Sequence, residues 1–78
     1  MREKIFRLVI AFDTTEAAIA MEKLCAEQGL PGRLIPVPRA ITANCGLAWS
    51  APPEERERIL SAAAASGLRT AGAYTMLL

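Results

Sequence analysis

The chain has 78 residues, which is enough for one domain and too few for two hydrophobic cores. Nine Lys and Arg residues against eight Asp and Glu residues give a net charge of +1. These charges are scattered along the sequence, whereas nucleic-acid binding requires a clustered basic face. No apolar run approaches the roughly 20 residues that span a bilayer. We therefore expect one cytoplasmic domain over residues 1–78 that binds neither nucleic acid nor membrane.

The chain contains no histidine and only two cysteines. Without histidine, the chain cannot form a Ser-His-Asp or Cys-His pair. Two cysteines outside a CxxC pair fall short of the four ligands of a structural zinc site. We expect free thiols, no metal and no cofactor, and we do not expect a stand-alone hydrolase or metalloenzyme.

The first two predicted elements are a central strand over residues 5–12 and a helix that follows it. Both faces of the strand are mostly apolar, as in a strand covered on both sides. Asp13 and Glu16 have the spacing of a capping box at the helix start. Gly29 is the expected C-cap, because Pro31 prevents continuation of the helix.

Two further strands are predicted over residues 33–37 and 46–51, joined by a loop. Pro36 favours a position at the edge of the sheet, where a missing N–H is tolerated. A second helix is expected from Pro52, where proline suits the first turn, to Gly67. Residues 71–76 read as the last strand.

This order, βαββαβ, predicts an α+β domain of the ferredoxin-like type, a four-stranded antiparallel sheet with both helices on one face. Arg7 is the only charge on the second face of the first strand, beside Ile5, Val9 and Ala11. Two helices cannot cover both faces of a sheet, and large apolar patches usually mark interfaces. We therefore expect self-association.

Cys45 is the candidate functional residue. The predicted topology places it at the same edge of the sheet as the start of the first helix. The other residues expected near it are Asp13, Thr14, Thr15, Arg39, Thr42 and Arg69. A helix N-terminus or an arginine favours the thiolate, and Gly46 would let a partner approach the sulfur. In the alternative interpretation, Cys45 is an ordinary half-buried loop residue and Arg39 a solvated charge.

Cys25 lies within the apolar arc of the first helix, which favours a role in core packing. It follows the helix start by about ten residues, or roughly 15 Å along the axis. A disulfide between Cys25 and Cys45 is therefore not expected in this topology.

The segment "LIPVPRAITANCGLAWSAPPEERERIL" resembles the central motif of the selenium/sulfur carrier protein-like family of small bacterial proteins. The resemblance extends over nearly the whole chain. The motif joins a Pro-x-Pro-Arg turn to Cys-Gly-hydrophobic-Ala and then to a Pro-acidic helix start. The matching residues are Pro36, Pro38, Arg39, Cys45, Gly46, Leu47, Ala48, Pro53, Glu54 and Arg56.

This resemblance implies that Cys45 carries sulfur or selenium, as a persulfide or selenosulfide, and passes it to an acceptor protein. The expected donor is a cysteine desulfurase or a related sulfurtransferase, so that the donor performs the difficult chemistry. Residues expected to support the site are Arg39, Gly46, Thr42, Thr14 and Thr15. The main alternative is a non-catalytic interaction or regulatory module whose Cys45 loop shapes a binding edge. A redox sensor ranks below both, because no resolving cysteine lies nearby.

Overall fold

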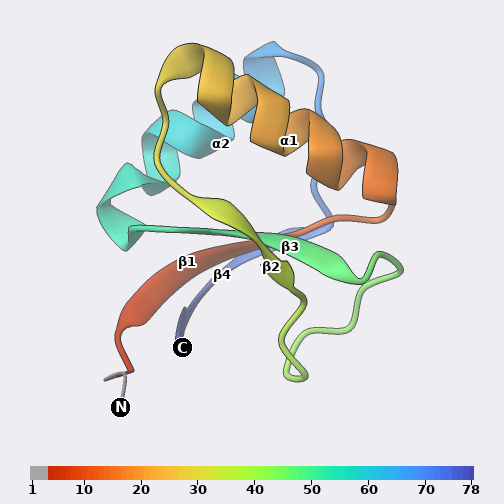
Figure 1. Cartoon of the computed structure of the whole chain (residues 1–78), viewed down its shortest axis with the longest axis vertical. Coiled ribbons are helices and arrows are strands. Elements are labelled where there is room, and N and C mark those ends of the chain that lie inside the picture. The colour runs from red at the N-terminus through yellow and green to blue at the C-terminus, as the bar shows by residue number, and fades with distance from the viewer. Residues whose placement is uncertain (1–3) are drawn as a thin grey trace.

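A computed structural model describes residues 4–78 (Figure 1). The chain runs through the expected βαββαβ order, with one short 3₁₀ turn, η1, before the second helix. The elements are β1 (Phe6–Ala11), α1 (Thr15–Gln28), β2 (Arg33–Pro36), β3 (Leu47–Ala51), η1 (Pro53–Glu55), α2 (Arg56–Ala65) and β4 (Gly72–Leu77). The last strand lies one residue later than the sequence predicted.

The four strands form one antiparallel sheet in the order β2-β3-β1-β4. Both helices cover the same face of this sheet, which confirms the predicted ferredoxin-like fold (Figure 1). β1 is a central strand, which explains why both of its faces are apolar. β2 is an edge strand that ends at Pro36, whose missing N–H is tolerated at the edge of a sheet.

Helix α1 begins one residue later than the predicted capping box. Thr14, not Asp13, is the N-cap: its backbone is extended, and its hydroxyl accepts a bond of 3.1 Å from the N–H of Ala17. This shift puts Ala17, and not Glu16, three residues after the cap, so no capping box forms. Gly29 ends the helix as predicted, with a φ of 67° that favours glycine.

The main core lies between the sheet and the two helices. β1 contributes the alternate residues Leu8 and Ile10, and Phe12 follows on the same side. The other members of this core are Ala18, Met21, Leu24, Cys25, Leu30, Cys45, Trp49, Ala51, Ile59 and Ala63. None of the helices within residues 4–78 is both long and apolar enough to cross a membrane.

The face of the sheet away from the helices, called here the open face, is partly covered by the chain itself. Val9, Ala11 and Ala48 are buried there together with Ile41, which comes from the loop between β2 and β3. Residues 37–46, which form this loop, turn back beneath the sheet in Figure 1. We predicted self-association on the assumption that nothing covers this face. It stays a prediction, and the exposed apolar area on which it rests is smaller than that of a bare face.

Candidate functional site

Cys45 stands at the end of the β2–β3 loop, two residues before β3. Its backbone N–H donates to the carbonyl oxygen of Phe12, the first residue after β1, at 3.4 Å. The side chain then turns toward the helix layer, where it joins the main core. The loop is thereby attached to the edge where β1 ends and α1 begins, which is the edge predicted for this cysteine.

Two groups lie at hydrogen-bonding distance from the Cys45 Sγ atom. The backbone N–H of Leu47 donates to Sγ at 3.3 Å, and the hydroxyl Oγ1 of Thr15 lies 3.8 Å from it. Thr15 is the first residue of α1, so the sulfur lies beside a helix N-terminus. Backbone N–H groups and the positive end of a helix dipole both favour a negatively charged sulfur. Of the supporting residues expected from the sequence, Thr15 contacts the sulfur and Thr14 caps the adjoining helix.

The thiol is not on the surface. Cys45 is only 3% exposed, whereas a carrier requires a sulfur that partners can reach. Its neighbour Gly46 is exposed, and a Cβ added there would meet no atom within 4 Å. The backbone next to the buried sulfur is thus exposed at Gly46, while the sulfur itself is not reached without a movement of the chain.

The loop of residues 37–46, which carries the thiol near its end, is held by few contacts besides the bond from Cys45 to Phe12. Val37 donates its N–H to the carbonyl of Gly46 at 3.0 Å, which closes the base of the loop. Ile41 donates to the carbonyl of Pro38 at 3.0 Å, and its side chain is buried on the open face. These contacts are few and local, as in segments that open without global unfolding.

Arg39 and Thr42 are both exposed, and the contacts to the sulfur come from Thr15 and Leu47 instead. Arg39 lines a hollow on the open face, together with Arg7 from β1. Cys45 packs on the helix side of the sheet, so the structure does not bring Arg39 to the thiol as expected. The bond from the Leu47 N–H to the Cys45 Sγ atom was not predicted from the sequence.

Cys25 is 1% exposed and packs in α1 with its Sγ atom 3.7 Å from the Sδ atom of Met21. Burial raises the pKa of the Cys25 thiol, because the surrounding core disfavours the thiolate. Cys25 and Cys45 are both free thiols. The predicted role of Cys25 in core packing is confirmed.

Fold and site together define a small ferredoxin-like α+β domain with one buried cysteine at the end of a loop, beside a helix N-terminus. A protein-family model described as "Putative Se/S carrier protein-like" matches residues 7–75. The chain belongs to this family, as the motif around Cys45 predicted. Comparison with curated proteins and with solved structures gives no match.

Proposed function

We propose that the protein carries sulfur or selenium on Cys45 and passes it to an acceptor protein. Membership of the carrier family supports this function. The observation that carries the assignment to Cys45 is the environment of its Sγ atom, where the N–H of Leu47 donates beside the first residue of α1. The same donor would stabilise a thiolate before loading and the anionic chalcogen after it.

Loading and delivery are two exchange reactions at sulfur. In loading, the Cys45 thiol releases its proton to solvent, and the thiolate attacks the terminal sulfur of a persulfide on the donor. A new S–S bond forms on Cys45, the S–S bond of the donor breaks, and the donor cysteine leaves as a thiolate. In delivery, a nucleophile of the acceptor attacks the terminal sulfur, and Cys45 leaves as a thiolate. Neither step needs an external oxidant or reductant, and selenium follows the same course.

Burial of the thiol sets one requirement on these reactions. The sulfur must leave the core before a donor can reach it, and the route passes the exposed Gly46. The loop of residues 37–46 is the segment that has to move. Docking of the donor against this loop would therefore precede transfer.

The proposal includes a donor of the cysteine desulfurase or sulfurtransferase class and a cytoplasmic location. Two free thiols in a chain of this size support that compartment, because glutathione and thioredoxin keep thiols reduced there. In this proposal the protein is a carrier, and the catalysis belongs to its donor.

The test is intact mass measurement after incubation with a cysteine desulfurase and cysteine. We expect a gain of one sulfur atom that disappears on reduction with dithiothreitol. Cys45→Ser should abolish this gain, and the matched variant Cys25→Ala should keep it. Folding of both variants is checked by circular dichroism. Loading of Cys45→Ser, or loss of loading in Cys25→Ala alone, would contradict the assignment.

The 3% exposure of Cys45 favours a second candidate, an interaction module in which the thiol only packs the loop. In that case Cys45→Ser should preserve the function of the protein in cells. In a carrier the same substitution should abolish it. Complementation of a deletion strain with each variant separates the two functions.

A further inference from the structure

The open face carries a second feature, a groove of about 700 Å³ beneath β1, β2 and β3. It extends from the start of β1 and the last residue of the chain to the first part of the β2–β3 loop. The residues that line it are Ile5, Arg7, Arg33, Ile35, Pro36, Val37, Pro38, Arg39, Ser50 and Leu78. Cys45 is not among them, so the groove does not contain the thiol, although Val37, Pro38 and Arg39 belong to the loop that ends beside Cys45.

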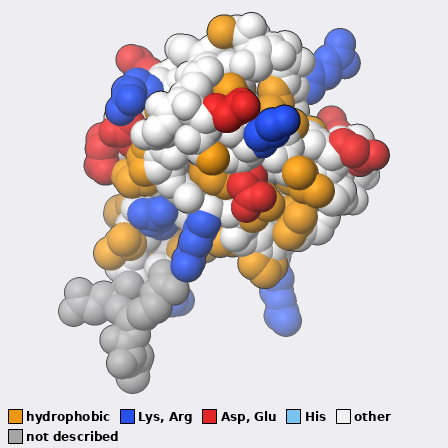
Figure 2. Space-filling model, turned by 45° about the horizontal axis from the view of Figure 1, so that its top comes forward, with side chains coloured by type: hydrophobic (Ala, Val, Ile, Leu, Met, Phe, Trp, Pro, Cys, Tyr) orange, Lys and Arg blue, Asp and Glu red, His pale blue; other side chains and the backbone are white. Residues whose placement is uncertain are grey.

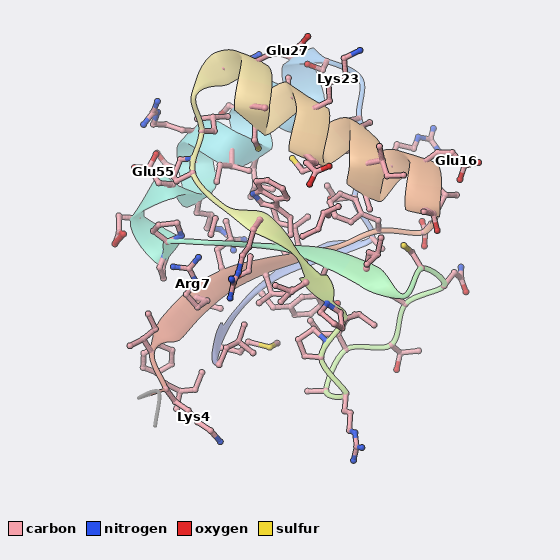
Figure 3. All side chains as sticks on the ribbon, in the orientation of Figure 1. Lys4, Arg7, Glu16, Lys23, Glu27 and Glu55 are labelled. Atoms are coloured by element: carbon pink, nitrogen blue, oxygen red, sulfur yellow. The ribbon has the colours of Figure 1, made fainter. Side chains whose placement is uncertain are left out.

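All charged side chains that line the groove are those of arginines: Arg7, Arg33 and Arg39. Within residues 4–78, every Asp and Glu lies in a helix, in η1 or in the connection before α1. These acids are Asp13, Glu16, Glu22, Glu27, Glu54, Glu55 and Glu57. Figure 3 shows Glu16 and Glu27 on α1 and Glu55 beside the second helix, whereas Arg7 belongs to β1.

The helix side is electrically mixed by comparison. Figure 2 shows acidic and basic side chains interspersed over that side of the molecule. The groove therefore differs from the rest of the described surface in the sign of its charge. Because opposite charges attract over several ångströms at a protein surface, this asymmetry selects an anionic occupant.

One of the three arginines is fixed in position before any ligand binds. Arg7 is half-buried, and its Nε donates to the hydroxyl of Ser50 at 3.1 Å. Ser50 is only 4% exposed, and it is the buried polar residue of the described chain. The bond to Nε leaves the two terminal nitrogens of the Arg7 guanidinium for a ligand. A guanidinium held in this way loses less side-chain entropy on binding a carboxylate.

A second arginine lies on the other side of the same serine. Arg33 is the cross-strand partner of Ser50 in the β2–β3 pair, so Arg7 and Arg33 flank Ser50 on the open face. Both guanidinium groups are positively charged and line the same groove, so they repel each other. A carboxylate placed between them removes that repulsion, which increases the gain from binding.

The groove is otherwise apolar. Ile5, Ile35, Val37 and Leu78 contribute aliphatic surface between and around the arginines. An inorganic anion would leave this surface uncovered. A ligand that combines carboxylates with aliphatic side chains would satisfy both parts of the lining.

Other occupants fit the charges less well. A second copy related by two-fold symmetry would place the arginines of one groove against those of the other. Nucleic acid binding depends on many basic contacts, and the chain has a net charge of only +1. We propose that the groove binds an acidic, aliphatic segment of a partner polypeptide, with its carboxylates on Arg7, Arg33 and Arg39.

The test uses a fluorescein-labelled peptide of alternating aspartate and leucine, with binding followed by fluorescence anisotropy. We expect saturable binding to the full chain that weakens as sodium chloride is raised. The same peptide with asparagine in place of aspartate should bind at least about tenfold more weakly, since it lacks charge-assisted hydrogen bonds. Cys45→Ser should bind the acidic peptide as the wild type does, which keeps this test independent of the proposed carrier function.

Single variants locate the binding site. Arg7→Gln should weaken binding about tenfold, and the exposed Arg33→Gln and Arg39→Gln by about twofold to fivefold each. The matched control is Arg56→Gln, an exposed arginine of α2 that should leave the affinity unchanged. Because Arg7→Gln also loses the bond to Ser50, its melting temperature is measured beside that of the two exposed variants.

The proposal is wrong if the acidic and asparagine peptides bind equally, or if Arg56→Gln weakens binding as much as the groove variants do. Competition arms identify a different occupant. Binding of inorganic phosphate and of a single-stranded oligonucleotide is measured in the same way. If one of them binds the groove arginines and the peptide does not, that ligand and not a polypeptide is the occupant of the groove. Sedimentation that shows self-association lost in Arg7→Gln would assign the groove to a second copy of the chain.

Discussion

Ile41 and Cys45 lie in one loop but are buried on opposite faces of the sheet. Ile41 packs with Val9, Ala11 and Ala48 on the open face. Cys45 enters the core on the helix side, where the N–H of Leu47 donates to its sulfur. The loop therefore has one buried side chain on each face of the sheet. Release of one of these side chains from its packing loosens the other. Access to the thiol is therefore linked to packing on the face that has no helix.

This link predicts that Ile41→Ala exposes Cys45. Removing a buried isoleucine side chain should lower the free energy of unfolding by about 2 kcal/mol or more. Because the loss falls on the loop, iodoacetamide should label Cys45 at least about tenfold faster, while labelling of Cys25 changes much less. Peptide mass spectrometry after a short pulse measures both rates.

The matched control for this experiment is Ile59→Ala, which removes a fully buried isoleucine from α2. It should destabilise the protein by a similar amount without a selective effect on Cys45. If Ile41→Ala accelerates both cysteines equally, the thiol is reached by global unfolding and not by opening of the loop.

A second prediction concerns Arg39 and reverses the expectation from the sequence. If an arginine lay beside the thiol, it would stabilise the thiolate, and its removal would slow alkylation. Arg39 instead lines the groove on the open face. Arg39→Ala should therefore leave the rate of Cys45 labelling at neutral pH within about twofold, the range of a screened surface charge. A much larger decrease would place the guanidinium near the sulfur after all.

The sequence predicted the fold well because its signals are local. Apolar residues on both faces of β1 indicated a central strand, and Gly29 and Pro36 marked a helix end and a sheet edge. The one-residue error at the start of α1 arose because Asp13 and Thr14 are both good N-caps. Only the bond from Ala17 to Thr14 decides between them.

The site was predicted less completely, for a different reason. Residues 37–46 have no periodic pattern, so nothing in the sequence showed that the loop turns beneath the sheet and buries Ile41. That turn sends Arg39 to the open face and places Cys45 in the core. Thr15 was predicted near the sulfur because the topology alone places the start of α1 at that edge. The contact from Leu47 depends on the backbone course at residues 45–47, which a sequence does not reveal.

Two glycines provide a paired prediction about stability and access. Gly32 has a φ of 132°, and a Cβ there would collide with the indole Nε1 of Trp49 and the carbonyl of Ser50. Gly32→Ala should lower the free energy of unfolding by about 2–4 kcal/mol. A Cβ added at Gly46 meets no atom within 4 Å. Gly46→Ala should therefore change the free energy of unfolding by less than about 0.5 kcal/mol.

Urea denaturation measures both variants, and Gly46→Ala serves as the control for adding a methyl group. Equal effects of the two substitutions would contradict the packing of Gly32 against Trp49. Bulkier Gly46→Val tests access, because it should slow loading of Cys45 by a donor while the protein stays folded. Unchanged loading would mean that donors do not approach past Gly46.

The last prediction follows from the buried thiol of Cys25. Burial raises its pKa in the folded protein above the value of about 8.5 in the unfolded chain. Between these two values the unfolded chain has lost the proton that the folded protein keeps, so the folded state binds more protons. Stability is therefore full below about pH 8.5 and falls as the pH rises toward the folded pKa. Urea denaturation of the wild type and of Cys25→Ala from pH 7 to pH 10 measures this effect. The variant has lost packing and should be less stable at pH 7, but its stability should fall less steeply with pH. Parallel curves for the two proteins would show that Cys25 does not contribute to the alkaline loss of stability.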